Sequence, residues 1–334
     1  MVKAEHYSLQ NYNTFGFPVI TRYFFEYDSE EQLKRALPEI HRPIFNIGGG
    51  SNLLFLDNYN GTVIHSAIDG IEVVNQDYNY VYIKAGSGVI WDDFVEYTVR
   101  QNWWGAENLS FIPGQVGSSA VQNVGAYGVE AKDIIYQVEA VDTDSLQTVI
   151  LSNGECRFSY RSSVFKAELK DKYVITYVTF KLSRKPKPVL TNNSLKERFA
   201  AIPYPFIKEI RNAIIEIRQS KLPDVSQLGS AGSFFKNPIV DKSCADRLLQ
   251  SYPSMPCFAT DGGMFKLSAG WLLETAGWRG YRSGNVGVYD KHALILVHYG
   301  GGTGKEMLSL VGKIQKSVRD KFLIELEPEV IFIG

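Results

Sequence analysis

The sequence contains few cysteines and no long apolar run, and these absences exclude several classes of protein. Its 334 residues include three cysteines, an odd number at wide spacing, which argues against a disulfide framework and matches no zinc motif. The five histidines form no metal-binding signature either. No apolar stretch reaches the roughly 18 residues of a membrane helix, and the first residues lack a signal-peptide pattern. We therefore expect a cytoplasmic protein without a bound metal and without a membrane partner.

The sequence also lacks an excess of either charge. Lys and Arg number 35 against 36 Asp and Glu, giving a net charge of −1. Such a chain has no overall basic field for non-specific nucleic-acid binding, so we expect no nucleic-acid partner. At 45% hydrophobic and 21% charged residues the composition is that of an ordinary globular protein, and the length predicts two or three domains.

Residue periodicity predicts a mixed chain of helices and strands. Ser29 and Gln32 form a capping-box pattern before an apolar-spaced stretch, which predicts a helix start. Strand-like runs stand at 43–47, 71–74, 81–85, 136–142, 148–151, 173–182, 293–297 and 329–333. Helical patterns stand at 91–101, 207–220, 243–250, 267–275 and 307–318. The proline-rich residues 184–188 predict a connection.

Two clusters hold many of the 29 glycines. Residues 47–52 run from a strand into three glycines, Ser51 and Asn52, a pattern that fits either a diphosphate-binding nest or a tight turn. They form neither a Walker loop nor the dinucleotide fingerprint, which disfavours a Rossmann fold. Residues 105–128 show no helix or strand periodicity, so we expect a long irregular segment with a functional use. The two clusters could clamp the ends of an extended dinucleotide.

Seven motifs, in order along the whole chain, resemble those of the UDP-N-acetylenolpyruvoylglucosamine reductase family, in its long form. They are NTFG at 13–16, GGGSNLLF at 48–55, IPGQVGSSAVQNVGAYGVE at 112–130, YRSSVFK at 160–166, SKLPD at 220–224, AGSFFKNP at 231–238 and LEPEV at 326–330. The resemblance implies an FAD enzyme of peptidoglycan precursor synthesis. It implies an α+β chain whose FAD-binding fold is of the vanillyl-alcohol-oxidase/p-cresol-methylhydroxylase type, with an additional α+β substrate-binding domain.

The resemblance also implies a domain division and a cofactor site. One FAD-binding subdomain would span residues 1–70, a second 71–222 and 322–334, and the substrate-binding domain 223–321. The cofactor, non-covalent FAD, would be bound by residues of the two glycine clusters and one further position: Gly48, Gly49, Gly50, Ser51, Asn52, Ile112, Pro113, Gly114, Gly117, Ser118, Ser119, Gln122, Asn123, Gly125, Ala126, Tyr127, Gly128 and Ile175.

The reaction implied by the resemblance has two stages, in which NADPH reduces FAD and the flavin N5 then delivers hydride to an enolpyruvyl double bond. Negative charge develops into the substrate carboxylate, so the site needs electrophiles and a proton donor. Matched to the motifs, Ser233 would donate the proton, and Arg161 and Glu329 would stabilise the charge. By residue type alone they read as a turn serine, a surface arginine and a solvated carboxylate. Glu327 is a second carboxylate in the last motif.

Four further positions are candidate substrate contacts: Lys221, Asn237, His292 and Asn192. Two depart from the family pattern, because Asn192 stands in a loop where some members carry tyrosine, and His292 stands where some carry glutamine. We expect a monomer that binds a UDP-sugar and NADPH. Two alternatives stay open: another flavin oxidoreductase of the same fold, such as a sugar-lactone oxidase, or a non-catalytic FAD- or nucleotide-binding protein.

Overall fold

A computed structural model describes residues 2–202 and 204–334, and the chain divides into two compact units. Each unit collects separate stretches of the sequence. Unit 1 comprises Met1–Tyr7, Thr21–Gly49 and Asn60–Ser220, and unit 2 comprises Ser8–Ile20, Gly50–Tyr59 and Lys221–Gly334. The three-part division expected from the sequence is not tested by this partition and stays a prediction.

Unit 1 contains two large sheets, besides a two-stranded ribbon. One has the order β1-β2-β5-β3 and includes a parallel pair, β3 with β5; the other has the order β11-β10-β12-β7-β6 and is antiparallel throughout. The first sheet is built from β1 (Val2–Ser8), β2 (Ile20–Tyr27), β3 (Ile44–Ile47) and β5 (Tyr59–Ser66). The second is built from β6 (Ile71–Gln76), β7 (Tyr80–Gly86), β10 (Ile135–Asp142), β11 (Thr148–Ser152) and β12 (Tyr173–Ser183). The strands predicted in these regions are confirmed, with ends shifted by one or two residues.

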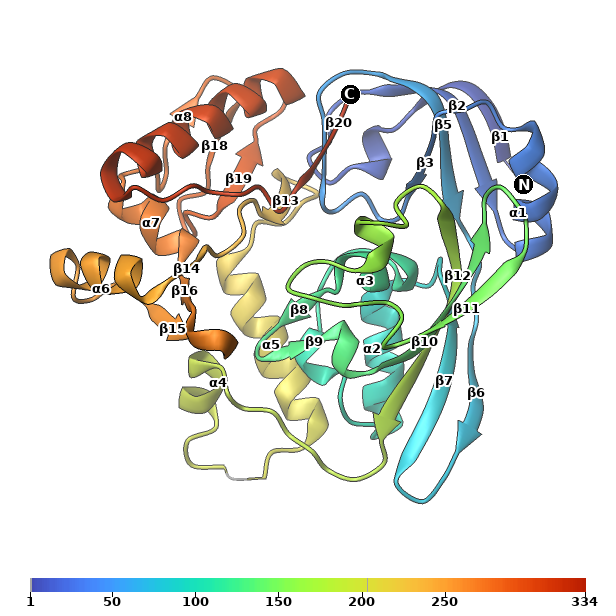
Figure 1. The fold of residues 1–334 in the computed structure, drawn as a ribbon, viewed down its shortest axis with the longest axis horizontal. Helices are drawn as coiled ribbons and strands as arrows, with labels where there is room; N and C mark the ends of the chain where they lie inside the picture. The colour runs from blue at the N-terminus through green and yellow to red at the C-terminus, as the bar shows by residue number, and fades with distance from the viewer. Residues whose placement is uncertain (1, 203) are drawn as a thin grey trace. The chain divides into compact units, whose positions relative to one another are not determined.

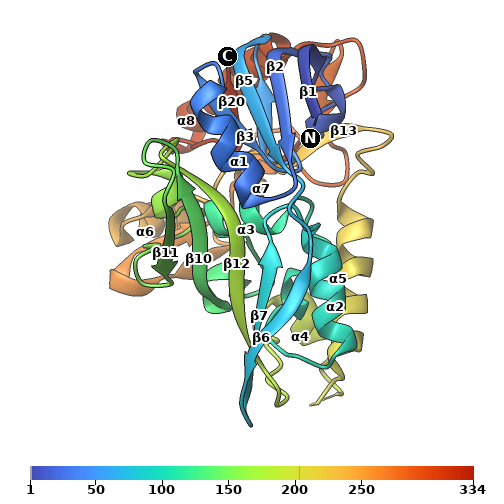
Figure 2. The same cartoon turned by 90° about the vertical axis from the view of Figure 1, so that its right-hand side faces the viewer.

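Helices cover one face of the five-stranded sheet, as Figures 1 and 2 show for α2 and α3. Val81, Ile83 and Ala85 point into this layer because alternate residues of β7 face the same side. Ile210 and Ile214 of α5 join the same core. The helices and helical turns of unit 1 are α1 (Glu30–Ala36), η2 (Leu37–Glu39), α2 (Trp91–Arg100), η3 (Glu107–Leu109), α3 (Val116–Gln122), η4 (Ala131–Asp133), η5 (Val164–Lys166), α4 (Asn193–Arg198) and α5 (Ile207–Lys221).

The prediction of an irregular segment at 105–128 is wrong in its middle. This stretch holds the 3-10 turn η3, the helix α3 and the strand β8 (Gly125–Ala126), which forms a two-stranded ribbon with β9 (Val129–Glu130) directly after the stretch. The helix forms because the Gln115 backbone N–H donates to Ser118 Oγ at 3.1 Å and because Val116 and Ala120 are buried in the core. By contrast, the Ser29 cap of α1 is confirmed, since its side chain accepts from Gln32 N–H.

Unit 2 combines three small sheets with three helices. The sheets have the orders β13-β19-β18-β17, β14-β16-β15 and β20-β4, the last a parallel pair. Their strands are β4 (Leu53–Phe55), β13 (Gly229–Ser233), β14 (Ile239–Val240), β15 (Cys257–Ala259), β16 (Phe265–Leu267), β17 (Arg282–Ser283), β18 (Val286–Val288), β19 (Ile295–His298) and β20 (Ile331–Ile333). The helices and helical turns are η1 (Gln10–Tyr12), α6 (Lys242–Ser251), η6 (Asp261–Gly263), α7 (Ala269–Thr275) and α8 (Gly304–Phe322).

Two sequence predictions in unit 2 have different outcomes. The apolar stripe of the last helix is confirmed: α8 buries Met307, Leu310 and Ile314, and its capping box uses Thr303. The helix predicted from residue 267 begins late, because Leu267 still pairs with Cys257 in the small sheet and Ser268 is the N-cap of α7.

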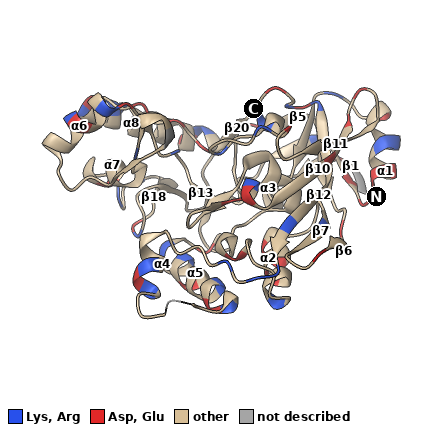
Figure 3. Ribbon diagram, turned by 60° about the horizontal axis from the view of Figure 1, so that its bottom comes forward, with Lys and Arg blue, Asp and Glu red and all other residues tan. Residues whose placement is uncertain are grey.

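Charges of both signs are mixed along the helices, as on α5 in Figure 3. Among the described residues no helix is both long enough and apolar enough to cross a membrane. All three cysteines are free thiols, and burial raises the pKa of Cys156 to about 12, so this thiol is packed and unreactive.

Candidate active site

In unit 1 Gly48 and Gly49 of the first glycine cluster lie directly against the second cluster. A Cβ atom placed on Gly49 would stand 2.9 Å from Gly114 Cα, and one on Gly48 would stand 3.2 Å from Ser118 Cβ. Only glycine allows the two backbones to approach this closely. Gly48, Gly49 and the segment 112–118 contain no carboxylate and carry backbone N–H groups. This donor set and this close approach fit the diphosphate of a dinucleotide.

Several residues of the second cluster hold the segment together and offer no side chain to a ligand. Gly117 packs on Ser87, and Ser119 Oγ donates to its own helix at Val116 O, 2.6 Å away. Asn123 is fully buried, ends α3 with a φ of 47°, and donates to Ser159 O at 2.9 Å. Ile175 is also buried, in the core of the five-stranded sheet. The remaining cluster positions of unit 1 are at least partly exposed: Ile112, Pro113, Gly114, Ser118, Gln122, Gly125, Ala126, Tyr127 and Gly128.

Arg161 lies beside this segment in unit 1. Its Nη2 donates to the Gly125 carbonyl at 2.7 Å, and its Nη1 stands 4.0 Å from Glu130 Oε1. The side chain is 18% exposed, and its guanidinium lies over the Tyr160 ring. Arg161 is therefore not an ordinary surface arginine, because the hydrogen bond to the Gly125 carbonyl holds its guanidinium in a partly buried position.

In unit 2 Ser233 stands at the edge of a pocket of about 440 Å³. Asn237 and His292 line the same pocket, so three of the predicted site residues meet there. Ser233 is exposed at the end of β13, and the neighbouring Gly232 has a φ of 70°. The Asn237 side chain accepts from Ala269 N–H at 2.9 Å, which ties the pocket to the first turn of α7. Other lining residues were not found from the sequence: Ser268, Gly270, Trp271, Glu274, Lys291, Ala293 and Leu294.

The backbone places Glu329 next to Ser233. Glu329 N–H donates to Phe234 O at 2.8 Å, one residue beyond Ser233. Asn52 fixes the same segment, because its Nδ2 donates to Glu329 O at 3.1 Å. Glu327 is different: it is exposed and forms an ion pair with Lys236. Of the two carboxylates of the last motif, Glu329 is therefore the one whose main chain is held beside Ser233.

His292 is held as a neutral imidazole. Its Nδ1 accepts from Leu294 N–H at 3.2 Å, so the proton of the neutral ring belongs on Nε2. Burial lowers the pKa of His292, and the positive charge of Lys221 lowers it further. Lys221 itself is exposed, at the last position of α5.

Asn192, in unit 1, has a structural use: its side chain caps α4 by accepting from Ser194 N–H at 3.0 Å. Two residues with a bearing on the site were missed by sequence reasoning. Glu130 faces Arg161, and its position two residues after Gly128, inside the matched motif, was the available signal. Gln115, inside the same motif, donates to Gly88 O at 3.0 Å and anchors the start of α3.

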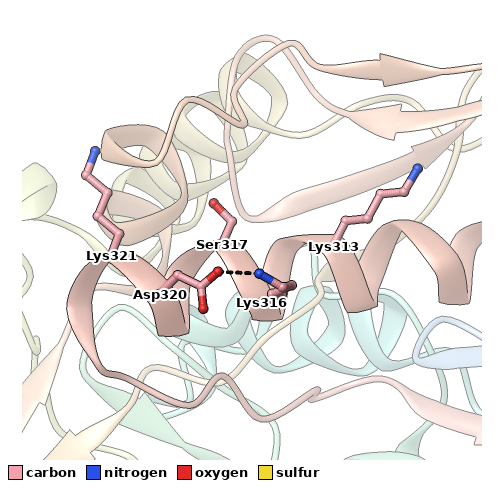
Figure 4. Close-up of a pocket in the computed structure, with 5 residues that line it drawn as sticks. All are labelled: Lys313, Lys316, Ser317, Asp320 and Lys321. Carbon is pink, nitrogen blue, oxygen red and sulfur yellow. Dashed lines mark hydrogen bonds and ion pairs between the residues drawn. The ribbon is translucent and has the colours of Figure 1, made fainter.

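A second hollow, of about 550 Å³, follows α8 and includes none of the predicted residues. Figure 4 shows its lining of Lys313, Lys316, Ser317, Asp320 and Lys321, with an ion pair between Lys316 and Asp320. The lysines project away from one another, and nothing there resembles a catalytic arrangement. Within the part of the chain that the structure describes, no cluster of three His, Cys, Asp or Glu side chains could hold a metal ion.

Comparisons with known proteins agree with the motifs. Residues 224–333 match the family described as UDP-N-acetylenolpyruvoylglucosamine reductase, C-terminal domain, and residues 21–149 match the FAD binding domain. A protein named UDP-N-acetylenolpyruvoylglucosamine reductase from Bacteroides fragilis (strain YCH46) is 43% identical over 331 residues, 98% of this chain and 99% of that protein. A protein of the same name from Flavobacterium johnsoniae is 41% identical over 330 residues, 98% of each chain.

A solved structure is similar over the full length. The UDP-N-acetylenolpyruvylglucosamine reductase from Thermus caldophilus aligns with a TM-score of 0.68 at 24% identity, covering 100% of this chain and 98% of that one. With the family matches, it identifies the fold as α+β, with an FAD-binding domain and an additional domain that matches the C-terminal domain of the reductase family.

Proposed function

Because the chain belongs to the UDP-N-acetylenolpyruvoylglucosamine reductase family, we propose that it uses NADPH and bound FAD to reduce the enolpyruvyl group of UDP-N-acetylglucosamine enolpyruvate, forming UDP-N-acetylmuramate. This is an oxidoreductase step of peptidoglycan precursor synthesis. The observation that carries the proposal is the pocket of unit 2 that Ser233, Asn237 and His292 line. The Glu329 backbone pairs with Phe234, the residue after Ser233. Action as a monomer in the cytoplasm stays a prediction.

The proposed cofactor contacts are the two glycine clusters. Gly48, Gly49 and Gly114 bring the backbone close, and Ser51 adds a hydroxyl, whereas the Ser118 hydroxyl donates to Gln115 O at 2.7 Å and would leave its main chain for the cofactor. Bound FAD would take hydride from NADPH and supply it to the substrate double bond. The buried residues Gly117, Ser119, Asn123 and Ile175 would then act by holding the segment and the sheet in place, without touching the cofactor.

The proposed catalytic residues stabilise, or neutralise with a proton, the negative charge that hydride addition creates on the substrate. A guanidinium stays protonated and can bind a carboxylate through two parallel N–H groups, which suits Arg161 to the substrate carboxylate. Glu329 would share a proton with that carboxylate and so help to delocalise the charge. The Ser233 hydroxyl would donate the proton that completes the reduction, and Lys221, Asn237 and His292 would bind the nucleotide and sugar.

The role of Ser233 is tested by separating the two half-reactions. We expect Ser233→Ala to keep NADPH-dependent bleaching of the yellow enzyme, and to slow re-oxidation by the enolpyruvyl substrate by about 10²- to 10⁴-fold, the usual contribution of a general acid. Anaerobic stopped-flow absorbance measures both rates. Ser317→Ala, on the outer hollow of α8, is the matched control and should change neither rate. Equal losses in both half-reactions would exclude a proton-donor role.

The same measurement on the unaltered protein tests the function as a whole. A yellow protein that NADPH does not bleach would be a binding protein. A protein that NADPH bleaches, but that the enolpyruvyl sugar nucleotide does not re-oxidise, would be a different reductase.

A further inference from the structure

The position of Arg161 depends on a glycine and a carboxylate. The guanidinium donates to the Gly125 carbonyl at 2.7 Å. A Cβ atom on Gly125 would stand 2.8 Å from Arg161 Nη1 and 2.9 Å from Glu130 Cγ. A Cβ at position 125 would therefore displace both side chains from their present positions, and the Gly125 carbonyl directs one edge of the guanidinium.

Glu130 faces Arg161 but does not reach it. Glu130 Oε1 stands 4.0 Å from Arg161 Nη1, beyond the range of a hydrogen bond. The other oxygen, Oε2, is held by Lys132 Nζ at 2.9 Å and by Asn123 Nδ2 at 3.1 Å. Glu130 is thus restrained through Oε2, and its side chain also accepts from the Asp133 backbone N–H in a capping box, while Oε1 faces the arginine without a hydrogen bond to it.

The restraint on Glu130 is itself rigid. Asn123 is fully buried, its Nδ2 also donates to Ser159 O at 2.9 Å, and its Oδ1 accepts from Lys132 N–H at 3.0 Å. Lys132 is therefore fixed at its backbone by the same asparagine that shares the carboxylate with it. We call Asn123 and Lys132 the brace.

The distance of 4.0 Å has a chemical consequence. A carboxylate at hydrogen-bond distance would form a forked pair with the guanidinium, the same pair that a carboxylate ligand needs. At 4.0 Å its charge still attracts and orients the guanidinium, because the pair is largely screened from solvent at 18% and 23% side-chain exposure. A small rotation of Glu130 would bring its carboxylate within hydrogen-bond distance of Arg161, where it would compete with a carboxylate ligand for the guanidinium.

We propose that the brace holds Glu130 back from Arg161, so that Glu130 positions the guanidinium without competing with the carboxylate of the substrate. Glu130 and Lys132 are thus positioning residues that tune recognition of a carboxylate-bearing ligand. The inference rests on the proposed function, in which Arg161 meets that carboxylate.

The test compares two ligands that differ in the carboxylate. Lys132→Met removes one arm of the brace and allows Glu130 to close onto Arg161. We expect the Kd of the FAD-loaded enzyme for UDP-N-acetylmuramate, and the KM for the enolpyruvyl substrate, to rise by about tenfold, a loss equivalent to one forked hydrogen bond. Binding of UDP-N-acetylglucosamine, which has no carboxylate, should change by less than about twofold. Isothermal titration calorimetry gives both Kd values.

The double variant separates positioning from simple destabilisation. Glu130→Gln with Lys132→Met removes the competing charge, and the Kd for UDP-N-acetylmuramate should return to within about threefold of the parent value. Lys132→Arg should preserve the parent Kd. Lys84→Met breaks a similar half-buried pair, Lys84 with Glu139 at 2.7 Å, elsewhere in unit 1 and should leave the Kd unchanged.

The outcomes are distinct. If Lys132→Met binds UDP-N-acetylmuramate like the parent, or if the double variant stays as weak as the single one, the brace has no such role while the proposed function stands. If the parent fails to bind UDP-N-acetylmuramate and to reduce the enolpyruvyl substrate, the proposed function and this inference are both overturned.

Discussion

Glu107 is a buried carboxyl group that the proposed chemistry does not use. Its side chain is 1% exposed, and Oε2 accepts from Gly105 N–H at 2.6 Å. Oε1 has no hydrogen-bond partner among the residues that the structure describes. Burial raises the pKa of Glu107 above its usual 4.5, and the Gly105 hydrogen bond opposes this only in part. At pH values between 4.5 and the raised pKa, Glu107 therefore retains its proton in the native protein and has lost it in the unfolded chain.

This proton makes the stability of the protein depend on pH. Between the usual pKa of 4.5 and the raised native value, the free energy of unfolding falls as pH rises, and above the native value it levels off. Glu107→Gln is neutral at every pH and should lack this loss. We expect its Tm relative to the parent to increase from pH 5 to pH 8, by about 1–2 °C for each kcal/mol involved. Thermal unfolding followed by circular dichroism checks this. The exposed Glu155→Gln should show a constant difference over the same range, and a constant difference for Glu107→Gln would contradict the argument.

At the scale of elements, the glycine-rich segment shows what the sequence could and could not predict. The strand entering Gly48 was predictable, because a β-branched and aromatic run ends in three glycines. The helix α3 was not, because glycine and serine at 117–119 have low helix propensity. It is stabilised by burial of Val116 and Ala120, which only the tertiary packing shows. Asn123 was predicted as a cofactor contact from its motif, yet its side chain is fully occupied within the protein.

The close approach of the two glycine clusters gives a prediction for this element. Gly49→Ala would place a Cβ atom 2.9 Å from the Gly114 backbone, so the two segments must separate. We expect the Kd of the apoprotein for FAD to rise at least about tenfold, an amount that 1.4 kcal/mol of strain would produce. Quenching of flavin fluorescence on binding measures it. Gly154→Ala has open space around its Cβ and should bind FAD like the parent. Unchanged FAD binding by a folded Gly49→Ala protein would show that the two clusters do not form a cradle for the cofactor.

At the scale of the molecule, the division into units could not be predicted from composition. Unit 2 gathers Ser8–Ile20, Gly50–Tyr59 and Lys221–Gly334, and no linker marks the first two segments. Backbone pairing holds them in place: β4 pairs in parallel with β20, and Thr14 O accepts from Ser230 N–H at 3.0 Å. Backbone pairs between residues so far apart in the chain produce no periodic pattern in the sequence, so they could not be predicted from it. The motif at 231–238 nevertheless singled out Ser233 and Asn237, and the family pattern singled out His292; these three residues line one pocket.

The nearly neutral charge of the whole molecule predicts a weak dependence on salt. With a net charge of −1 and both signs mixed along the helices, no long-range field attracts an anionic ligand. The proposed contacts, Arg161 and Lys221 with backbone amides, act at short range, where screening over a Debye length of about 8–10 Å matters little. We expect kcat/KM for the enolpyruvyl substrate to change by less than about threefold between roughly 50 and 200 mM choline chloride, since steered association falls much more steeply. Steady-state kinetics at constant potassium concentration check this, and Lys221→Gln should lower kcat/KM by a similar factor at every salt concentration. A steep fall for the parent would mean that a charged surface outside the proposed site guides the ligand.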